Sequence, residues 1–318
     1  MVDISVVIAT YNHQDYIEEA INSVLMQKGN FTYEVLIGED CSVDNTRKVL
    51  KKIEKKLPKN FKIYYREKNM GGYGENNFLD LYMRMTGRYY IVLEGDDFWV
   101  DEYKLEKQFN FLENNREYIA VAHNTIVVNK NGELINENYP ECKKDEYLIE
   151  DYAQGILPGQ TTTILMRNYI TFPMFDYRLI SSNQPGDRKK AFLLVANGRI
   201  KCMQEKMSAY RHVTDSGSSF SARTKRCSVD YNDVLTFYYS LNEYAVRCKL
   251  NLNVIKITEK MLFEYMIKCA IMRRANVNLF HLIIHFTKSE YKSELYKVTI
   301  FFIGKILKRL CYRLLGEK

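Results

Sequence analysis

Three carboxylates follow directly on an apolar run near the middle of the N-terminal half. Residues 89–93 are aromatic or aliphatic without a break, and Glu94, Asp96 and Asp97 come next. The unbroken run predicts a strand buried on both faces of a sheet. Because unpaired buried charge is very costly, the carboxylates must lie at the open end of that strand. Carboxylates crowded there suit a divalent cation shared with a phosphate group; a solvated acidic turn is the alternative.

Strand and helix patterns alternate around that run. Apolar segments of strand length occupy residues 4–9, 33–37 and 61–65, and helical patterns separate them. Such βα units predict an α/β fold, with a parallel sheet covered by helices on both faces. In open sheets of this kind, ligands bind beyond the carboxyl ends of the strands. We therefore expect the turns after several strands to meet around one cleft.

Those turns carry residues that suit a nucleotide. The carboxylate of Asp40 can accept a hydrogen bond from an imide N–H, as in uracil or thymine, although it could also only cap the next helix. The ring of Tyr11 can stack on a base, although a tyrosine there could equally belong to the core. The glycines of residues 71–74 permit close backbone approach to a ligand, with a surface turn as the alternative.

Taken in order, these motifs resemble family 2 of the inverting, nucleotide-sugar-dependent glycosyltransferases, which have the GT-A fold. The resemblance covers about residues 3–215 and is of the bacterial surface-polysaccharide type. It implies that the donor nucleotide is contacted by Thr10, Tyr11, Asn12, Asp40, Asn69, Gly71, Asn77 and Asp96. Relative to the family pattern, Gly72 is an apparent insertion; Glu39 and Cys41 replace the usual Asp and Gly or Asn, which could alter base or ribose contacts without removing the site.

The resemblance also implies a metal site and a catalytic base. Asp97 would hold Mn²⁺ or Mg²⁺, and Asp96 would touch the ribose or support the metal. His212 is a candidate third ligand of the metal or a contact of the diphosphate, with a purely structural histidine as the alternative. Asp187 opens a helix after Pro185 and Gly186, where the helix dipole keeps a carboxylate ionised. The resemblance makes Asp187 the general base; a plain helix cap is the alternative.

The later part of the chain predicts a different organisation. Residues 133–160 are polar and are predicted to be mostly loop, and residues 161–166 are predicted to form a strand of a mixed sheet. The whole therefore divides into a GT-A domain over 1–225 and a helical C-terminal region over 226–318.

Charge and cysteine content limit the possible partners and cellular compartment of the protein. The net charge is +7, but residues 201–318 hold 21 Lys and Arg against 10 Asp and Glu, so the N-terminal part is acidic and does not suggest a nucleic-acid partner. The seven cysteines are scattered without a CxxC pair, which favours a reducing compartment over a zinc site or disulfide framework. With neither a signal peptide nor an apolar run of about 20 residues, we expect a cytoplasmic protein.

The C-terminal tail has an amphipathic pattern. On a helix, one stripe consists of Ile300, Ile303, Leu307, Leu310 and Leu314, while Lys and Arg lie on the other side. Such a helix can lie on an anionic membrane, so residues 297–318 predict peripheral attachment to the inner face of the cell membrane. An ordinary helix packed on the globule is the alternative.

The predicted activity is metal-assisted, inverting transfer of a sugar from a nucleotide-diphosphate sugar, most simply of the UDP type. The acceptor is a hydroxyl of a glycan or lipid-linked sugar, as in surface polysaccharide synthesis. A sugar-phosphate nucleotidyltransferase is one alternative, but residues 10–13 do not form the Gly-rich, basic loop it needs. A non-catalytic nucleotide-sugar or glycan-binding module is another. The sequence leaves the oligomeric state open.

Overall fold

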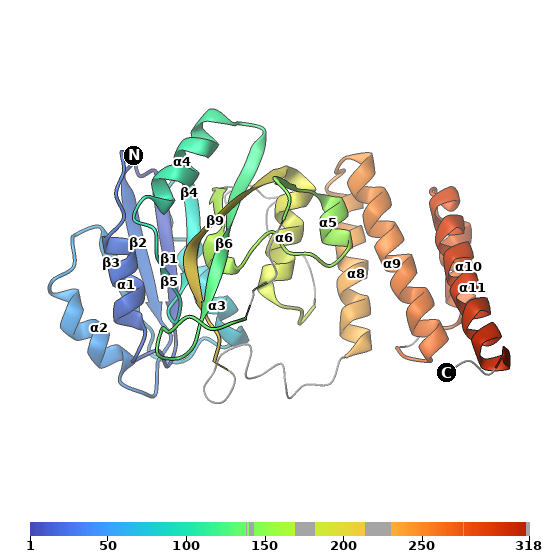
Figure 1. The fold of residues 1–318 in the computed structure, drawn as a ribbon, viewed down its shortest axis with the longest axis horizontal. Coiled ribbons are helices and arrows are strands. Elements are labelled where there is room, and N and C mark those ends of the chain that lie inside the picture. The colour runs from blue at the N-terminus through green and yellow to red at the C-terminus, as the bar shows by residue number, and fades with distance from the viewer. Residues whose placement is uncertain (138, 140–142, 169–181, 214–229, 276, 316–318) are drawn as a thin grey trace. The chain divides into compact units, whose positions relative to one another are not determined.

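The computed structural model describes residues 1–315 except 138, 140–142, 169–181, 214–229 and 276, and it describes no side chains at residue 73 or from 305 onward. The described chain forms two compact units. The first contains all the strands, and the second contains the helices from α8 to α11 (Figure 1). The predicted boundary between 225 and 226 lies outside the described residues.

The first unit opens with the predicted βα alternation. Its elements up to the acidic turn are β1 (Ile4–Thr10), α1 (Ile17–Leu25), β2 (Tyr33–Glu39), α2 (Thr46–Glu54), β3 (Phe61–Tyr65), the short helix η1 (Gly72–Gly74), α3 (Glu75–Tyr82) and β4 (Tyr89–Glu94). β1 pairs in parallel with both β2 and β4, and β2 pairs in parallel with β3. The carboxyl ends of β1, β2 and β4 therefore meet at one edge of the sheet.

The remaining elements of the first unit complete a mixed sheet. They are β5 (Phe98–Trp99), α4 (Lys104–Asn114), β6 (Tyr118–Val128), β7 (Glu146–Tyr147), α5 (Ile149–Ala153), η2 (Thr161–Thr163), β8 (Leu165–Arg167), α6 (Gly186–Asn197) and β9 (Arg199–Arg211). The sheet order is β3-β2-β1-β4-β8-β6-β9-β5, with β7 paired to β9. β8 is antiparallel to both of its neighbours, so the sheet is mostly but not entirely parallel.

The described residues of 133–160 are mostly loop, as predicted, although β7 and α5 lie within them; both are too short for periodicity to reveal. One prediction for this part is wrong. The strand predicted for 161–166 begins only at Leu165, after a turn of 3₁₀ helix in which Gln160 accepts a hydrogen bond from the Thr162 N–H.

Alternation along the central strands gives the sheet two apolar faces. On one face, Ile8, Ile37 and Leu93 pack in a core with α1, α2 and α4. On the other face, the ring of Tyr90 meets Tyr82 of α3, with centroids 5.6 Å apart. Helices thus cover both faces, and the open end of the sheet is left to the polar turns.

The second unit is helical. Its helices are α8 (Tyr231–Arg247), α9 (Leu252–Met272), α10 (Leu279–Lys288) and α11 (Lys292–Leu315). Asp230, Asn251 and Asn278 cap the first three of them by accepting hydrogen bonds from backbone N–H groups of the first turn. In the described part of the chain, no helix is both long and apolar enough to cross a membrane.

Candidate functional site

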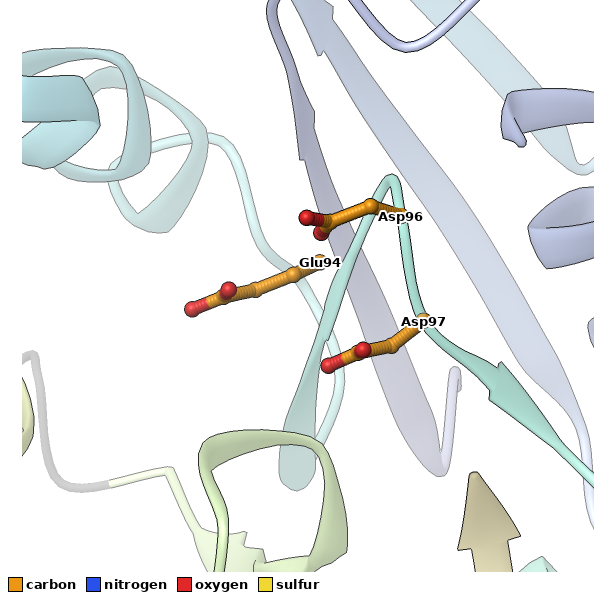
Figure 2. A group of neighbouring side chains, drawn as sticks. All are labelled: Glu94, Asp96 and Asp97. Carbon is orange, nitrogen blue, oxygen red and sulfur yellow. The ribbon is translucent and has the colours of Figure 1, made fainter. Parts of the chain in front are cut away.

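The acidic turn after β4 gathers its carboxylates on one side. Glu94, Asp96 and Asp97 each offer an oxygen, and these atoms all lie within 4.8 Å of one another. Figure 2 shows the three side chains leaving the turn between β4 and β5 in the same direction. Gly95 is required between them, because a Cβ there would lie 2.8 Å from both Thr10 and His13. The close packing of this turn against the end of β1 therefore fixes the geometry of the cluster.

Asp97 is the buried member of this cluster. Its Oδ1 accepts a hydrogen bond from the Arg211 backbone N–H (2.8 Å), and its Oδ2 accepts one from Gln160 Nε2 (2.7 Å). Burial, followed by the charges of Asp96 and Glu94, raises the pKa of Asp97 well above its usual range. The cluster thus holds more negative charge than its surroundings favour, which a bound cation would relieve.

Arg211 supports the turn from β9. Its buried side chain donates from Nε to the backbone carbonyl of Asp96 (2.9 Å), pairs with Glu19 and stacks over Tyr16, with the guanidinium 4.5 Å from the ring centroid. The guanidinium is therefore bonded to the backbone of the acidic turn. Arg211 thus helps to position the turn that carries the carboxylates.

His13 faces the same cluster from the end of β1. Its Nε2 lies 3.7 Å from Asp96 Oδ2, and its Nδ1 lies 3.3 Å from Thr10 Oγ1. The ring thus bridges the Thr10 turn and the acidic turn. His212 directly follows Arg211; its Nδ1 contacts the carboxylate of Glu137, and it is not part of the group formed by Glu94, Asp96 and Asp97.

The end of β2 lies beside the end of β1. Asp40 donates its backbone N–H to the carbonyl of Thr10 (3.0 Å), and its Oδ1 accepts a hydrogen bond from the Met70 N–H (2.7 Å). Burial raises the pKa of Asp40, and the Met70 N–H opposes that effect. Asn12, at the end of β1, accepts a hydrogen bond from the Val43 N–H (3.0 Å), which ties the two turns together.

The loop after β3 is held to Asp40. Asn69 donates from Nδ2 to the Asp40 carbonyl (3.0 Å), and its Oδ1 accepts from the Gly71 N–H (2.9 Å). Asn77 is buried, with Nδ2 bonded to the Gly38 carbonyl (2.9 Å). The side chains of both asparagines form hydrogen bonds that hold this end of the sheet in place. Tyr11 is half-buried next to the same turns.

Two of the departures from the family pattern have structural consequences. Glu39 is fully buried and accepts hydrogen bonds from the Ser42 N–H (2.6 Å) and from Arg47. Cys41 has a φ of 59°, in the left-handed region that Gly and Asn adopt more easily. Glu39 is therefore engaged within the fold, and Cys41 retains the backbone conformation that the usual residues favour.

Asp187 lies at the start of α6, as predicted. Burial raises its pKa, against the effect of the Arg188 N–H and Lys190. One turn later, burial lowers the pKa of Lys190 to about 8, although the charges of Glu94 and Asp187 oppose it. The charges of Asp187, Glu94 and Asp97 likewise contribute, after burial, to the raised pKa of Tyr139. The charge of Asp187 therefore affects the pKa values of Lys190 and Tyr139, and both pKa values also depend on carboxylates of the acidic turn.

Of two cavities in the described part of the chain, one adjoins Asp187 and the other lies at the far end of β4. Asp187 and Lys190 line one of about 10 Å³, roughly enough for a single water. The other, of about 410 Å³, has arginine-rich walls made of Arg88, Tyr89, Glu113, Arg116 and Arg167. It lies at the start of β4, the opposite end of that strand from Glu94, and so does not belong to the acidic site.

Four residues at this site escaped the sequence analysis: His13, Tyr139, Gln160 and Arg211. Gln160 and Arg211 reach Asp97 across 63 and 114 residues of sequence, and no local pattern connects them. His13 adjoins the predicted turn of residues 10–12, so its position alone was a usable signal.

The protein-family model described as Glycosyl transferase family 2 matches residues 5–170, just over half of the chain. The chain belongs to this family. The predicted recognition is confirmed, and the matched residues contain the acidic turn, Asp40 and the Asn69 loop. Asp187 and Arg211 follow the matched segment.

Similar proteins include several from bacteria. An uncharacterised protein of Mycobacterium tuberculosis is 28% identical over 208 residues, which are 65% of this chain and 58% of that protein. The putative teichuronic acid biosynthesis glycosyltransferase TuaG of Bacillus subtilis is 39% identical over 110 residues, 34% of this chain and 41% of TuaG. The poly(ribitol-phosphate) beta-N-acetylglucosaminyltransferase TarS of Staphylococcus aureus is 28% identical over 178 residues, 54% of this chain and 30% of TarS. The matches thus span less than two thirds of each relative.

A solved structure shares the fold. The crystal structure of S. aureus TarS 1-349 in complex with UDP-GlcNAc aligns with a TM-score of 0.61 at 18% sequence identity. The alignment covers 93% of this chain and 79% of that one. This likeness confirms the predicted GT-A type of fold, a mostly parallel sheet flanked by helices with further helices at the C-terminus.

Proposed function

We propose that this chain is a metal-assisted, inverting glycosyltransferase that uses a UDP-type sugar donor. The observation that carries the proposal is the meeting of three strand ends, with Thr10, Asp40 and the acidic turn at one edge of the sheet. Family membership adds support, and so does the presence of UDP-GlcNAc in the TarS crystal. The sugar itself remains to be identified by assay.

The donor nucleotide would lie along the ends of β1 and β2. The Oδ1 of Asp40 accepts a hydrogen bond from the Met70 N–H, so Oδ2 is the oxygen that would accept the N3–H of uracil. Tyr11 would stack on the base, and Thr10, Asn12, Asn69, Gly71 and Asn77 would shape the pocket around it. Asn69 and Asn77 act mainly by holding the loop and strand that carry Asp40 and Gly71.

The acidic turn fits Mn²⁺ or Mg²⁺. Three carboxylates within 4.8 Å offer the hard oxygen ligands these ions prefer, and after burial the charges of Asp96 and Glu94 contribute to the raised pKa of Asp97. Asp97 would hold the ion, with Asp96 supporting it or touching the ribose. Glu94 is a further ligand of the same set. A cation there would supply Lewis-acid stabilisation of the departing diphosphate.

Asp187 is the proposed general base. It would take the proton from the acceptor hydroxyl as that oxygen bonds to the anomeric carbon, while the bond to the diphosphate breaks and its electron pair leaves with UDP. Burial raises the proton affinity of Asp187, which suits a base. One such displacement inverts the anomeric configuration.

The acceptor is proposed to be a hydroxyl of a glycan or lipid-linked sugar in surface-polymer synthesis. TuaG and TarS are both named for surface polymers, which supports this class. A cytoplasmic site at the inner face of the membrane would suit a lipid-linked acceptor. The two alternative functions, a nucleotidyltransferase and a non-catalytic binding module, remain to be excluded by assay.

The test is a transfer and hydrolysis assay across UDP-, GDP- and dTDP-sugars, with Mn²⁺ or EDTA. We expect UDP release from one UDP-sugar in the presence of Mn²⁺ only. Formation of a nucleotide-sugar from a sugar phosphate and UTP would favour the nucleotidyltransferase. Binding of a nucleotide-sugar without turnover, with a panel of glycan and lipid-linked acceptors present, would favour the binding module.

A further inference from the structure

Helix α10 has more large apolar side chains than its neighbours cover. Leu282 and Phe286 pack on a cluster built around Phe263 and Ile267 of α9. Three further large apolar side chains remain in solvent, with exposed fractions of 69% for Leu279, 66% for Phe280 and 52% for Ile283. A helix within a globule normally keeps a polar face outward, so this exposed face calls for a partner.

Helix α11 repeats this arrangement. Leu295 and Val298 are buried in the same cluster. Tyr296, Ile300 and Ile303 share the opposite face by their spacing, with exposed fractions of 59%, 51% and 50%. Ile300 and Ile303 are the first residues of the apolar stripe predicted for the tail, and each is about half exposed. The side chains of its later members lie outside the described residues.

The exposed residues of both helices adjoin a common support. Both helices pack on Phe263 and Ile267, and in the described part of the chain neither buries its remaining large apolar side chains. We call these exposed residues the α10–α11 surface, which consists of Leu279, Phe280, Ile283, Tyr296, Ile300 and Ile303. An exposed apolar surface of this kind marks a site of interaction.

Charge selects the class of partner. Residues 292–318 contain seven Lys and Arg but only two Glu. A second copy of the chain would bring the same positive charge to the contact. A polysaccharide chain would leave the apolar side chains unsatisfied. An anionic lipid surface answers both features, because acyl chains accept the apolar face and headgroups pair with the lysines.

We propose that the α10–α11 surface docks this protein on an anionic membrane. Helix α10 contributes directly, so attachment does not depend on the tail of residues 297–318 alone. The helices lie in the interface without crossing it, in keeping with the lengths and polarity of those described. The proposal stands apart from the transfer reaction, because binding to vesicles needs neither donor nor acceptor.

The test is flotation of the full chain with vesicles of phosphatidylcholine, with and without phosphatidylglycerol. One variant combines Leu279→Gln, Phe280→Gln and Ile283→Gln. The matched control combines Met83→Gln, Leu134→Gln and Val246→Gln, whose side chains are 75%, 70% and 54% exposed elsewhere in the chain. Because all six are exposed, both variants should melt close to the wild type. Melting curves identify any variant that misfolds; in that case the single change Phe280→Gln replaces the triple.

We expect the wild type and the control to float with phosphatidylglycerol vesicles and far less with phosphatidylcholine alone. The α10 variant should lose at least about tenfold in partitioning, since each removed apolar side chain lowers interfacial affinity. Deletion of residues 297–318 alone should also weaken binding. The loss should be smaller than when the deletion is combined with the three α10 substitutions. Equal flotation of the α10 variant and the wild type would overturn the proposal. So would a wild type that stays soluble, that floats equally with both vesicles, or that dimerises through the α10–α11 surface.

Discussion

Strand β4 has charged side chains at both ends, and the two ends use charge differently. At its start, Arg88 pairs with Asp3 (2.8 Å) and Glu113 (2.9 Å), so positive and negative groups balance. At its finish, about 17 Å away for a six-residue strand, three carboxylates crowd together around the buried Asp97. Balanced charge is typical of structural contacts, whereas like charge held in place is typical of ligand-binding and catalytic sites.

The supporting contacts sharpen this contrast. Arg167, near the start of β4, donates hydrogen bonds to Tyr89 Oη (3.0 Å) and to nearby backbone carbonyls. Arg211, at the other end, donates to the backbone of Asp96 and pairs with Glu19. Arg211 thus stabilises the acidic turn without neutralising the cluster at its carboxylates. Changes at the two ends should therefore have very different consequences, activity being affected at one end and only stability at the other.

The largest effect is expected for Asp187→Ala. Loss of the general base should lower kcat by about 10²- to 10⁴-fold. The affinity for UDP in the presence of Mn²⁺ should stay within a factor of a few, because Asp187 does not hold the nucleotide. Steady-state kinetics and UDP titration separate the two effects. Normal sugar transfer by this variant would remove Asp187 from the mechanism.

Gly95→Ala comes next. The added Cβ would lie 2.8 Å from Thr10 and His13, so the acidic turn must shift. A displacement of this order costs about 10²-fold in kcat/KM. Gly304→Ala is the matched control, because a Cβ there meets nothing within 4 Å, and its activity should be unchanged. Full activity of Gly95→Ala would mean that the geometry of the turn is not critical.

The dependence on pH is a smaller effect. Burial raises the pKa of Asp187, and only the ionised carboxylate can accept a proton. The kcat/KM should therefore fall about tenfold per pH unit as the pH drops below that raised pKa, at a pH higher than for an ordinary aspartate. Measurement of kcat/KM as a function of pH, with the preferred donor, would show this decrease. A flat profile down to the usual range of aspartate would contradict the assignment.

The smallest effects are expected at the start of β4. Arg88→Gln or Glu113→Gln breaks a partly exposed ion pair, which is worth about 0–1 kcal/mol of the free energy of unfolding. Thermal melting should show a small decrease, and kcat/KM should not change. A loss of activity close to that of Gly95→Ala would contradict the claim that the start of β4 affects stability alone.

The sequence predicted the N-terminal half better than the rest. β1, β2, β3 and β4 begin and end within about two residues of the predicted runs, because buried parallel strands give continuous apolar segments. β7 and α5 escaped prediction because two and five residues are too few to establish a period. The mixed character of the second half was anticipated from the loss of regular alternation.

For the site, local motifs were predictable and long-range contacts were not. The acidic turn, Asp40 and Asp187 carry their signal in the residues immediately around them. The support given by Gln160 and Arg211 depends on a fold that brings distant segments together. The burial of Asn77 likewise depends on its packing against Gly38, which no spacing in the sequence reveals.

The central claim is that the carboxylates beyond β4 recruit a divalent cation that binds a nucleoside diphosphate. Calorimetric titration of UDP, with Mn²⁺ and with EDTA, tests it most directly in the wild type, Asp97→Ala and Glu113→Gln. We predict that Mn²⁺ strengthens UDP binding at least about tenfold in the wild type and in Glu113→Gln, and that Asp97→Ala loses this gain. Equal UDP affinity with Mn²⁺ and with EDTA in the wild type would contradict the account.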